Sequence, residues 1–184
     1  MLVKIDDRVK VVLSEGGFMY CNCVWIDDDV QAVIDSGADL PSLRQAHPAD
    51  VDILINTHHH YDHVRGNYLF DRAQVFIHEL DLIPMTDEIQ MVHYNSLDRW
   101  PELMTGYDNY EAARLLGIEA AEIQRNMYAD ESFKDGRVFD FGSTRVEVIH
   151  TPGHSAGHCS FWFPEQDLLF SGDICLTKAG PWYG

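Results

Sequence analysis

The chain has 184 residues, of which 46% are hydrophobic and 23% are charged, so it is long and apolar enough to bury a core. Thirteen Lys and Arg stand against thirty Asp and Glu, which leaves a formal net charge of -17. Such a charge repels phosphate backbones and anionic membrane surfaces. The composition excludes a largely disordered chain, and we expect neither nucleic acid nor membrane among the partners.

We expect no secretion signal at the N-terminus. Residues 1–10 alternate charged residues with Val and Leu, and no apolar run approaches the ~20 residues of a membrane span. We therefore expect a cytoplasmic protein. Its cysteines, Cys21, Cys23, Cys159 and Cys175, are then expected to be reduced thiols.

Strand patterns come first along the chain. Short apolar runs between turn residues predict strands at 9–13, 21–26, 30–34, 51–56 and 74–78. Pro41 is expected to start a short helix that runs to about Ala46. The run 51–56 is almost continuously apolar, which is typical of a strand buried on both faces.

The segment 81–131 has a different character, because it shows helical periodicity without strand signals. In one stripe Ile89, Val92, Leu97 and Trp100 recur at helical spacing, with Thr86 as the expected N-cap. Two further stripes follow, at 108–116 and 120–127. We therefore expect a helical insert over 81–131.

Strand patterns resume after Gly136, with strands predicted at 137–141, 144–150, 158–163 and 168–170. Two strand-rich halves thus flank the helical insert. We expect a single domain over residues 1–184.

Potential metal ligands are concentrated directly after the strand predicted at 51–56. His58, His60, Asp62 and His63 offer three imidazoles and a carboxylate, a set that suits divalent ions such as Zn or Fe. On an extended segment His58, His60 and Asp62 would share one face. If the strand instead turns into a helix, His58 and His60 hold one cation while Asp62 and His63 reach a second.

Two later motifs also follow predicted strands. In His150-Thr151-Pro152-Gly153-His154, the Pro and Gly force a turn that presents His154 away from the sheet. Ser171-Gly172-Asp173 then supplies a carboxylate whose two oxygens are able to bridge two cations. Each motif alone is weak, but their order and positions make them specific together.

With these three motifs the sequence resembles the metallo-β-lactamase superfamily over nearly the whole chain. Members carry a His-x-His-x-Asp-His signature, then a Gly-His turn, then an Asp after a strand. The resemblance implies an α+β fold, the αββα sandwich, with metals at one edge of two sheets. Because an Asp stands where one zinc β-lactamase subgroup has Cys, the chain is more similar to the glyoxalase II and lactonase branches.

The resemblance implies a ligand set residue by residue. His58, His60 and His154 would form a first metal site, Asp62 and His63 would form a second, and Asp173 would bridge the two. One or two divalent ions are expected as cofactors, with Zn favoured and Fe or Mn as alternatives. Asp62 would also orient the nucleophile, which makes it the expected catalytic residue.

One departure concerns the C-terminal end. Dinuclear members supply a further His well downstream of the bridging Asp, whereas only eleven residues follow Asp173 here and none is His. We expect a truncated piece of a longer protein whose sandwich lacks its closing elements; the alternative is a natural variant with one incomplete site. The second site would then be weak, hydrolytic activity would be impaired, and exposed sheet edges would allow a homo-oligomer.

The expected activity is hydrolysis of a small ester-like substrate, a thioester or a lactone, by a metal-bound hydroxide. Two alternatives stay open. His58, His154 and Asp173 form a two-His-one-carboxylate set that suits mononuclear iron, as in the persulfide dioxygenase branch of the superfamily. The third reading is a non-catalytic metal-binding domain.

Other polar residues give weaker signals. His59 alternates with two expected ligands and should point away from them. His158 is expected either to hydrogen-bond near the site or to be a buried structural residue. His93 and Tyr94 are expected on the surface and in the core of a helix, with a lid over the pocket as the alternative.

Overall fold

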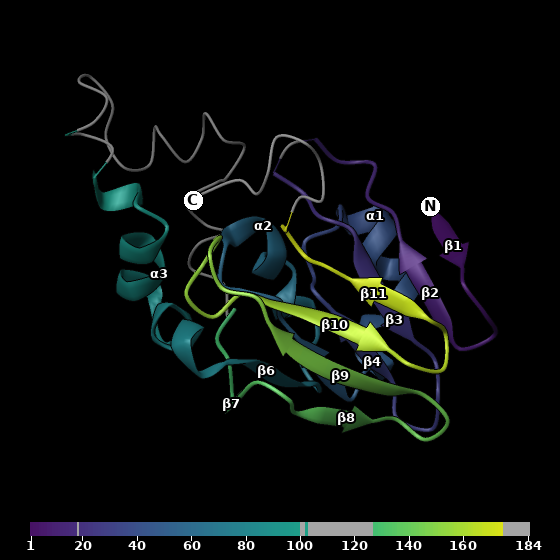
Figure 1. Cartoon of the computed structure of the whole chain (residues 1–184). Helices are drawn as coiled ribbons and strands as arrows, with labels where there is room; N and C mark the ends of the chain where they lie inside the picture. The colour runs from purple at the N-terminus through teal and green to yellow at the C-terminus, as the bar shows by residue number, and fades with distance from the viewer. Residues whose placement is uncertain (18, 100–101, 103–126, 175–184) are drawn as a thin grey trace.

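The computed structural model describes residues 1–17, 19–99, 102 and 127–174. Within them, two β-sheets face each other (Figure 1). The larger sheet contains β1 (Leu2–Lys4), β2 (Val9–Val12), β3 (Cys23–Ile26), β4 (Ala32–Ile34), β5 (Ile53–Ile55), β6 (Gln74–His78) and β7 (Glu131–Phe133), in that order. The smaller sheet contains β8 (Val138–Asp140), β9 (Arg145–His150), β10 (Cys159–Phe163) and β11 (Leu168–Phe170).

The larger sheet is mixed. Strands β1 to β4 form an antiparallel meander, and β4 to β7 pair in parallel. The central strand β5 consists of Ile53, Leu54 and Ile55, and only Ile53 is more than marginally accessible. This burial on both faces agrees with the unbroken apolar run predicted at 51–56.

The smaller sheet is antiparallel and alternates in burial. Along β9 the inward Val146 and Val148 are buried, whereas Arg145, Glu147 and Ile149 are exposed. The strands β8 to β11 lie at the front of Figure 1, facing the larger sheet. Their inward side chains supply half of the core between the sheets.

The main core lies between the two sheets. It is rich in aromatic residues and includes Phe76, Phe133, Phe139, Phe141, Phe161 and Phe163. Burial of one such side chain contributes about 1.5–3 kcal/mol. A second cluster, with Trp25, Leu54 and Phe70, packs on the other face of the larger sheet beneath helix α1 (Leu40–Leu43). The sandwich expected from the family resemblance is therefore confirmed.

Short helices connect the strands. Besides α1, they are α2 (Tyr61–Val64), α3 (Glu88–Tyr94) and 3-10 turns at Arg44–Ala46, Pro48–Asp50, Asn67–Leu69, Glu79–Asp81, Ile83–Met85 and Leu97–Arg99. Helix α3 lies at one end of the molecule (Figure 1). None of the helices in the described part of the chain is long and apolar enough to cross a membrane.

The helical insert is only partly confirmed. Helix α3 lies inside the predicted range 81–131, whereas the stripes at 108–116 and, except for its last residue, 120–127 fall outside the described residues. The predicted N-cap was wrong: Asp87 Oδ1 accepts the Gln90 N–H at 2.9 Å, while the Thr86 hydroxyl donates to the Ile83 carbonyl. A carboxylate is a good acceptor for the free N–H groups of the first turn. Its negative charge is also stabilised by the positive end of the helix dipole.

The apolar face of α3 also differs from the prediction. Ile89, which the periodicity placed toward the core, is 76% exposed, and Met91 is buried instead. Two strands were missed altogether, β1 and β7, and the second of these begins at the last residue of the predicted insert. The other predicted strands are present: those at 74–78 and 168–170 have the predicted bounds, and the rest are shorter by one to three residues.

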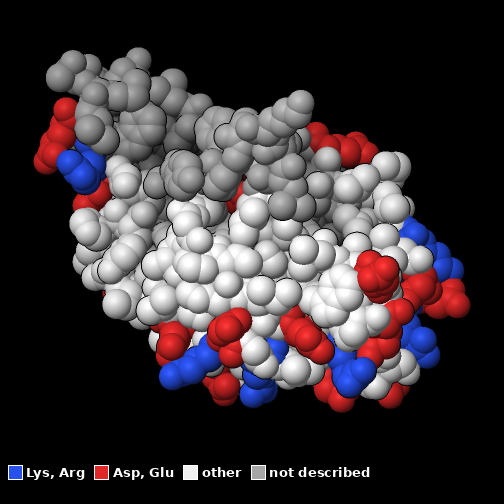
Figure 2. All heavy atoms as spheres, in the orientation of Figure 1, with Lys and Arg blue, Asp and Glu red and all other residues white. Residues whose placement is uncertain are grey.

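Cys21, Cys23 and Cys159 are free thiols, and Cys175 lies outside the described residues. The prediction that the sandwich lacks its closing C-terminal elements concerns chain after residue 174, which lies outside the described residues. Figure 2 shows charged side chains of both signs along one rim of the face in view, with a largely uncharged middle. On this face the excess of acidic residues does not form one acidic patch.

Candidate metal centre

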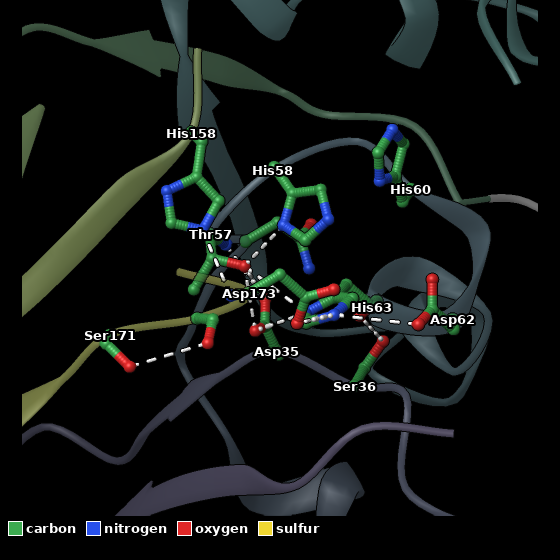
Figure 3. Close-up of polar contacts among 12 residues, drawn as sticks. Asp35, Ser36, Thr57, His58, His60, Asp62, His63, His158, Ser171 and Asp173 are labelled. Atoms are coloured by element: carbon green, nitrogen blue, oxygen red, sulfur yellow. Dashed lines mark hydrogen bonds and ion pairs between the residues drawn. The ribbon is translucent and has the colours of Figure 1, made fainter. Parts of the chain in front are cut away.

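The predicted ligands meet at one edge of the sandwich. The first cluster begins after β5 and continues into α2, so His58 and His60 lie in the connecting turn while Asp62 and His63 belong to the helix. His154 comes from the turn between β9 and β10, and Asp173 follows β11. Figure 3 shows His58, His63 and Asp173 close together, with Asp62 joined to His63 by a dashed line. The turn of strand into helix is the second of the two local geometries considered from sequence.

Three imidazole nitrogens form the first group, which consists of His58, His60 and His154. His60 Nδ1 lies 2.8 Å from His154 Nε2, which lies 3.2 Å from His58 Nε2. Burial and the neighbouring His59 and His154 rings lower the pKa of His60 to about 3, and burial lowers the pKa of His58 as well. Both rings are therefore neutral near pH 7 and offer lone pairs.

This first group fits a metal ion. A single proton joins only two of three converging nitrogens, whereas a cation at their centre accepts a lone pair from each. Three imidazoles are a common ligand set for Zn, and they also suit Fe and Mn. The donor chemistry of the described residues thus agrees with the expected cofactor.

Asp62, His63 and Asp173 are the residues predicted for the second group. The ligand atoms of His63 and Asp173 lie within 4.8 Å of one another and of a His58 nitrogen, whereas Asp62 lies outside this cluster. His63 Nε2 lies 3.0 Å from Asp173 Oδ1 and 3.7 Å from Asp62 Oδ2. The ring is buried, and this nitrogen makes no hydrogen bond of good geometry. A buried polar atom without a well-aligned partner is costly, which a cation bound by the same three residues would relieve. The second group therefore fits a metal as well.

The carboxylates link the two groups. Asp173 Oδ2 lies 3.4 Å from His154 Nε2, so Asp173 faces both groups at once. Burial opposes ionisation of Asp173, yet the His63 ring beside it lowers the pKa of that carboxyl to about 2. Burial raises the pKa of Asp62. The Asp173 side chain is 35% exposed and the Asp62 side chain is 24% exposed. The centre is therefore open to solvent on the side of these two carboxylates.

Asp35 contacts Thr57 and His63 on the side away from the ligand atoms, and it was not predicted from the sequence. The Thr57 hydroxyl donates to Asp35 Oδ2 at 2.9 Å and lies 2.9 Å from His58 Nδ1. If His58 donates from Nδ1 to this hydroxyl, its Nε2 keeps a lone pair for a metal. Asp35 directly follows β4, beside β5 in the parallel sheet, and that position was the available signal.

His63 and Cys21 also lie beside Asp35. Burial alone would lower the pKa of His63, but the carboxylates of Asp35, Asp173 and Asp62 hold it well above its ordinary value. Cys21 lies close enough to Asp35 and His63 to form a third cluster of potential ligands. Burial keeps the pKa of the Cys21 thiol well above its ordinary value, so it stays protonated.

The remaining histidines take several roles. His59 points away from the ligands to Asp81, as expected, at 3.0 Å. His158 Nε2 accepts the Asp173 N–H at 3.1 Å, which settles its role as a hydrogen-bond partner near the site. His93 is exposed and pairs with Asp98, in agreement with a helix surface. Of the six predicted ligands, His58, His60, His63, His154 and Asp173 belong to groups of converging ligand atoms, whereas Asp62 lies outside these groups. The ligand roles of all six stay a prediction.

Comparison with known protein families identifies the superfamily of this chain. The sequence profile of the metallo-beta-lactamase superfamily matches residues 16–183. The chain belongs to the metallo-beta-lactamase superfamily. The six predicted ligand residues all lie inside the matched range.

Curated relatives within the superfamily include two hydroxyacylglutathione hydrolases. The protein of Brucella anthropi is 28% identical over 155 residues, covering 81% of this chain and 45% of that protein. The protein of Rhodospirillum rubrum is 29% identical over 151 residues, covering 81% of this chain and 44% of that protein. The chain thus spans less than half the length of these relatives.

Solved structures of the superfamily share the fold. A metallo-beta-lactamase family protein from Thermus thermophilus has a TM-score of 0.65 at 22% identity, covering 98% of this chain and 64% of that one. A class B3 di-zinc metallo-beta-lactamase from an Alaskan soil metagenome has a TM-score of 0.60 at 20% identity, covering 88% of this chain and 56% of that one. At these identities the comparison shows the fold alone.

Proposed function

We propose that this chain carries the metal centre of a hydrolase that cleaves a small thioester. The observation that carries the proposal is the convergence of His58 Nε2, His60 Nδ1 and His154 Nε2, with His63 Nε2 nearby between the carboxylates of Asp173 and Asp62. The similarity to hydroxyacylglutathione hydrolases favours a thioester over the lactone that the sequence left as an alternative.

His58, His60 and His154 would hold one divalent ion, and Asp62, His63 and Asp173 would hold another. Bound divalent ions polarise a carbonyl oxygen and lower the pKa of bound water toward ~7. Asp62 has its carboxylate on the open side of the centre, where it would orient the attacking water. Asp35 and Thr57 would hold the imidazole rings of His63 and His58 in place from behind.

The charge of the centre supports this assignment. The rings of His58 and His60 are neutral near pH 7, so they bind a cation without first losing a proton. The low pKa of Asp173, about 2, keeps that carboxylate ionised at any pH at which the protein would work. A substrate carbonyl that approaches from the open side meets both groups.

The test uses the full chain, freed of metal and reloaded with Zn. Release of thiol from a hydroxyacylglutathione thioester is followed with a thiol reagent, and opening of a lactone is followed in parallel. We expect thioester cleavage by the wild type, loss of at least one bound ion and of activity in His58→Ala, and no change in His93→Ala, whose imidazole is 61% exposed on α3. Zn-loaded wild type that leaves the thioester intact would contradict the proposal, and opening of the lactone alone would favour the lactone alternative.

A mononuclear iron oxygenase is the second candidate. His154 Nε2 lies 3.2 Å from His58 Nε2 and 3.4 Å from Asp173 Oδ2, and this compact set would hold one iron without Asp62 or His63. The same preparation, loaded anaerobically with Fe(II), is therefore given a persulfide, and oxygen uptake is measured. Oxygen uptake together with no thioester cleavage would favour the oxygenase, and metal binding without either activity would leave a non-catalytic metal-binding domain.

A further inference from the structure

Asp81 is buried next to the predicted metal centre and contacts both turns that carry the first group of ligands. It is the last residue of the 3-10 turn that follows β6, and it is only 1% exposed. Its carboxylate accepts the His59 backbone N–H at 3.2 Å and lies 3.0 Å from His59 Nδ1. It also accepts the Ser155 hydroxyl at 2.6 Å and the Gly157 N–H at 2.7 Å.

These contacts join segments that are far apart in sequence. His59 lies between His58 and His60, and Ser155 directly follows His154, so each bond fixes the backbone next to a predicted ligand. An ionised carboxylate accepts hydrogen bonds at both oxygens, and here Oδ2 accepts two and Oδ1 accepts one. Asp81 therefore links the two turns through three hydrogen bonds, with the His59 ring beside it.

The packing leaves little freedom in this arrangement. A Cβ added to Gly157 would lie 2.7 Å from Asp81 Cγ and 2.8 Å from Oδ1. The turn after His154 thus touches the carboxylate directly, with no side chain or water-sized space between them. Asp81 itself is absent from the groups of converging ligand atoms in the described part of the chain.

We propose that Asp81 is a positioning residue that holds His58, His60 and His154 at the spacing required by one metal ion. The proposal rests on the function proposed above, because it assumes that this group binds a metal. Outer partners of this kind change metal affinity by about 10- to 100-fold when they are removed. Asp81 should therefore control the affinity of the first group and leave the second group largely unchanged.

The matched control is Asp28→Asn. The Asp28 side chain is 4% exposed, pairs with Arg8 and accepts the Ser143 N–H at 3.0 Å, so it also joins two turns. It precedes β4, whereas the ligands follow the carboxyl end of the parallel strand β5, at the opposite edge of the sheet. Both Asp→Asn changes remove a charge from a similarly buried bridge, but only one bridge touches the ligand turns.

The experiment is a Zn titration of metal-free protein against a chromophoric chelator. His60→Ala and Asp62→Ala assign the two binding steps, since each belongs to one group only. In Asp81→Asn we expect the His60-dependent step to weaken by about 10- to 100-fold and the Asp62-dependent step to change less than about threefold. Asp28→Asn should leave both steps unchanged, although both variants lower the unfolding free energy of the metal-free protein.

Ser155→Ala keeps the experiment decisive if Asp81→Asn does not fold, because it removes one donor and leaves the carboxylate. It should weaken the same step several-fold. Unchanged affinity in Asp81→Asn, or in Ser155→Ala where that variant alone folds, would overturn the positioning role while leaving the hydrolase proposal intact. Wild type that binds Zn through His60 but cleaves no thioester would overturn only the hydrolase proposal, and wild type without a His60-dependent step would overturn both.

Discussion

Asp35 Oδ2 lies 2.8 Å from His63 Nδ1, on the side of the imidazole opposite Asp173. Both residues are buried, and Asp35 also accepts the Thr57 backbone N–H at 2.8 Å. The ring is thereby held in one orientation with Nε2 directed toward the second group of ligands. A carboxylate that accepts the N–H on the far side of a metal-binding His ring orients the ring and raises the basicity of the nitrogen that faces the metal.

Asp35→Asn should weaken the Asp62-dependent Zn step by about 10- to 100-fold. Asn is the appropriate replacement because Asp35 has φ 60, a left-handed conformation that Asn tolerates better than Ala does. The measurement is the chelator titration, with Asp28→Asn as the control. An unchanged Asp62-dependent step would contradict the prediction, and an equal loss in both steps would mean that Asp35 also orients His58 through the Thr57 hydroxyl.

Gly37→Ala should destabilise the protein by about 3 kcal/mol or more. The added Cβ would lie 1.5 Å from the backbone oxygen of Asp62 and 2.7 Å from Cys21 Sγ, so helix α2 would have to move. Gly17→Ala is the matched control, because an added Cβ there has no neighbour within 4 Å. Urea unfolding of the metal-free proteins measures both, and similar midpoints for the two variants would contradict the clash.

The ligand cluster was predictable from sequence because its members are close together or follow strand signals. His58, His60, Asp62 and His63 lie within six residues, and the apolar run before them fixes which end of a strand they occupy. His154 and Asp173 each follow a strand in the same way. Parallel strands bring their carboxyl ends to one edge, so such residues meet without any knowledge of tertiary detail.

Asp35 and Asp81 were not predictable in the same way. Each is 22 residues from its partner in the ligand loop, and neither belongs to a motif. Their positions depend on which strands pair, because β4 and β6 lie on the two sides of β5. The strands β1 and β7 were missed for a different reason: each has three residues, and at most one of them is buried. Alternation is undetectable over so short a length.

Phe161→Ala should lower the unfolding free energy by about 3–5 kcal/mol. Phe161 is fully buried between the sheets, with its ring 6.3 Å from that of Phe133 across the sandwich. Ile149→Ala on the adjacent strand is the control, because Ile149 is 42% exposed on the outer face and should cost about 0.5 kcal/mol or less. Equal losses would mean that the outer face of the smaller sheet is covered in solution.

Asp39 should contribute to stability in a pH-dependent way. Its carboxylate caps α1 by accepting the Ser42 N–H at 3.1 Å, and it accepts the Glu15 N–H at 2.6 Å and the Ser14 hydroxyl at 3.0 Å. Burial opposes ionisation, but these donors outweigh it and lower the pKa of Asp39 from 3.8 to about 2. The ionised form is therefore favoured by folding.

The sign of the pH effect follows from that direction. Because the folded pKa lies below the unfolded one, the contribution of Asp39 is complete above pH 3.8 and disappears as the pH falls toward about 2. Asp39→Asn should thus cost about 1 kcal/mol at pH 6 and less at pH 3. Urea unfolding of the metal-free proteins at the two pH values gives the difference directly. A cost that is the same at both pH values would mean that the Asp39 hydrogen bonds stabilise the cap without depending on its charge.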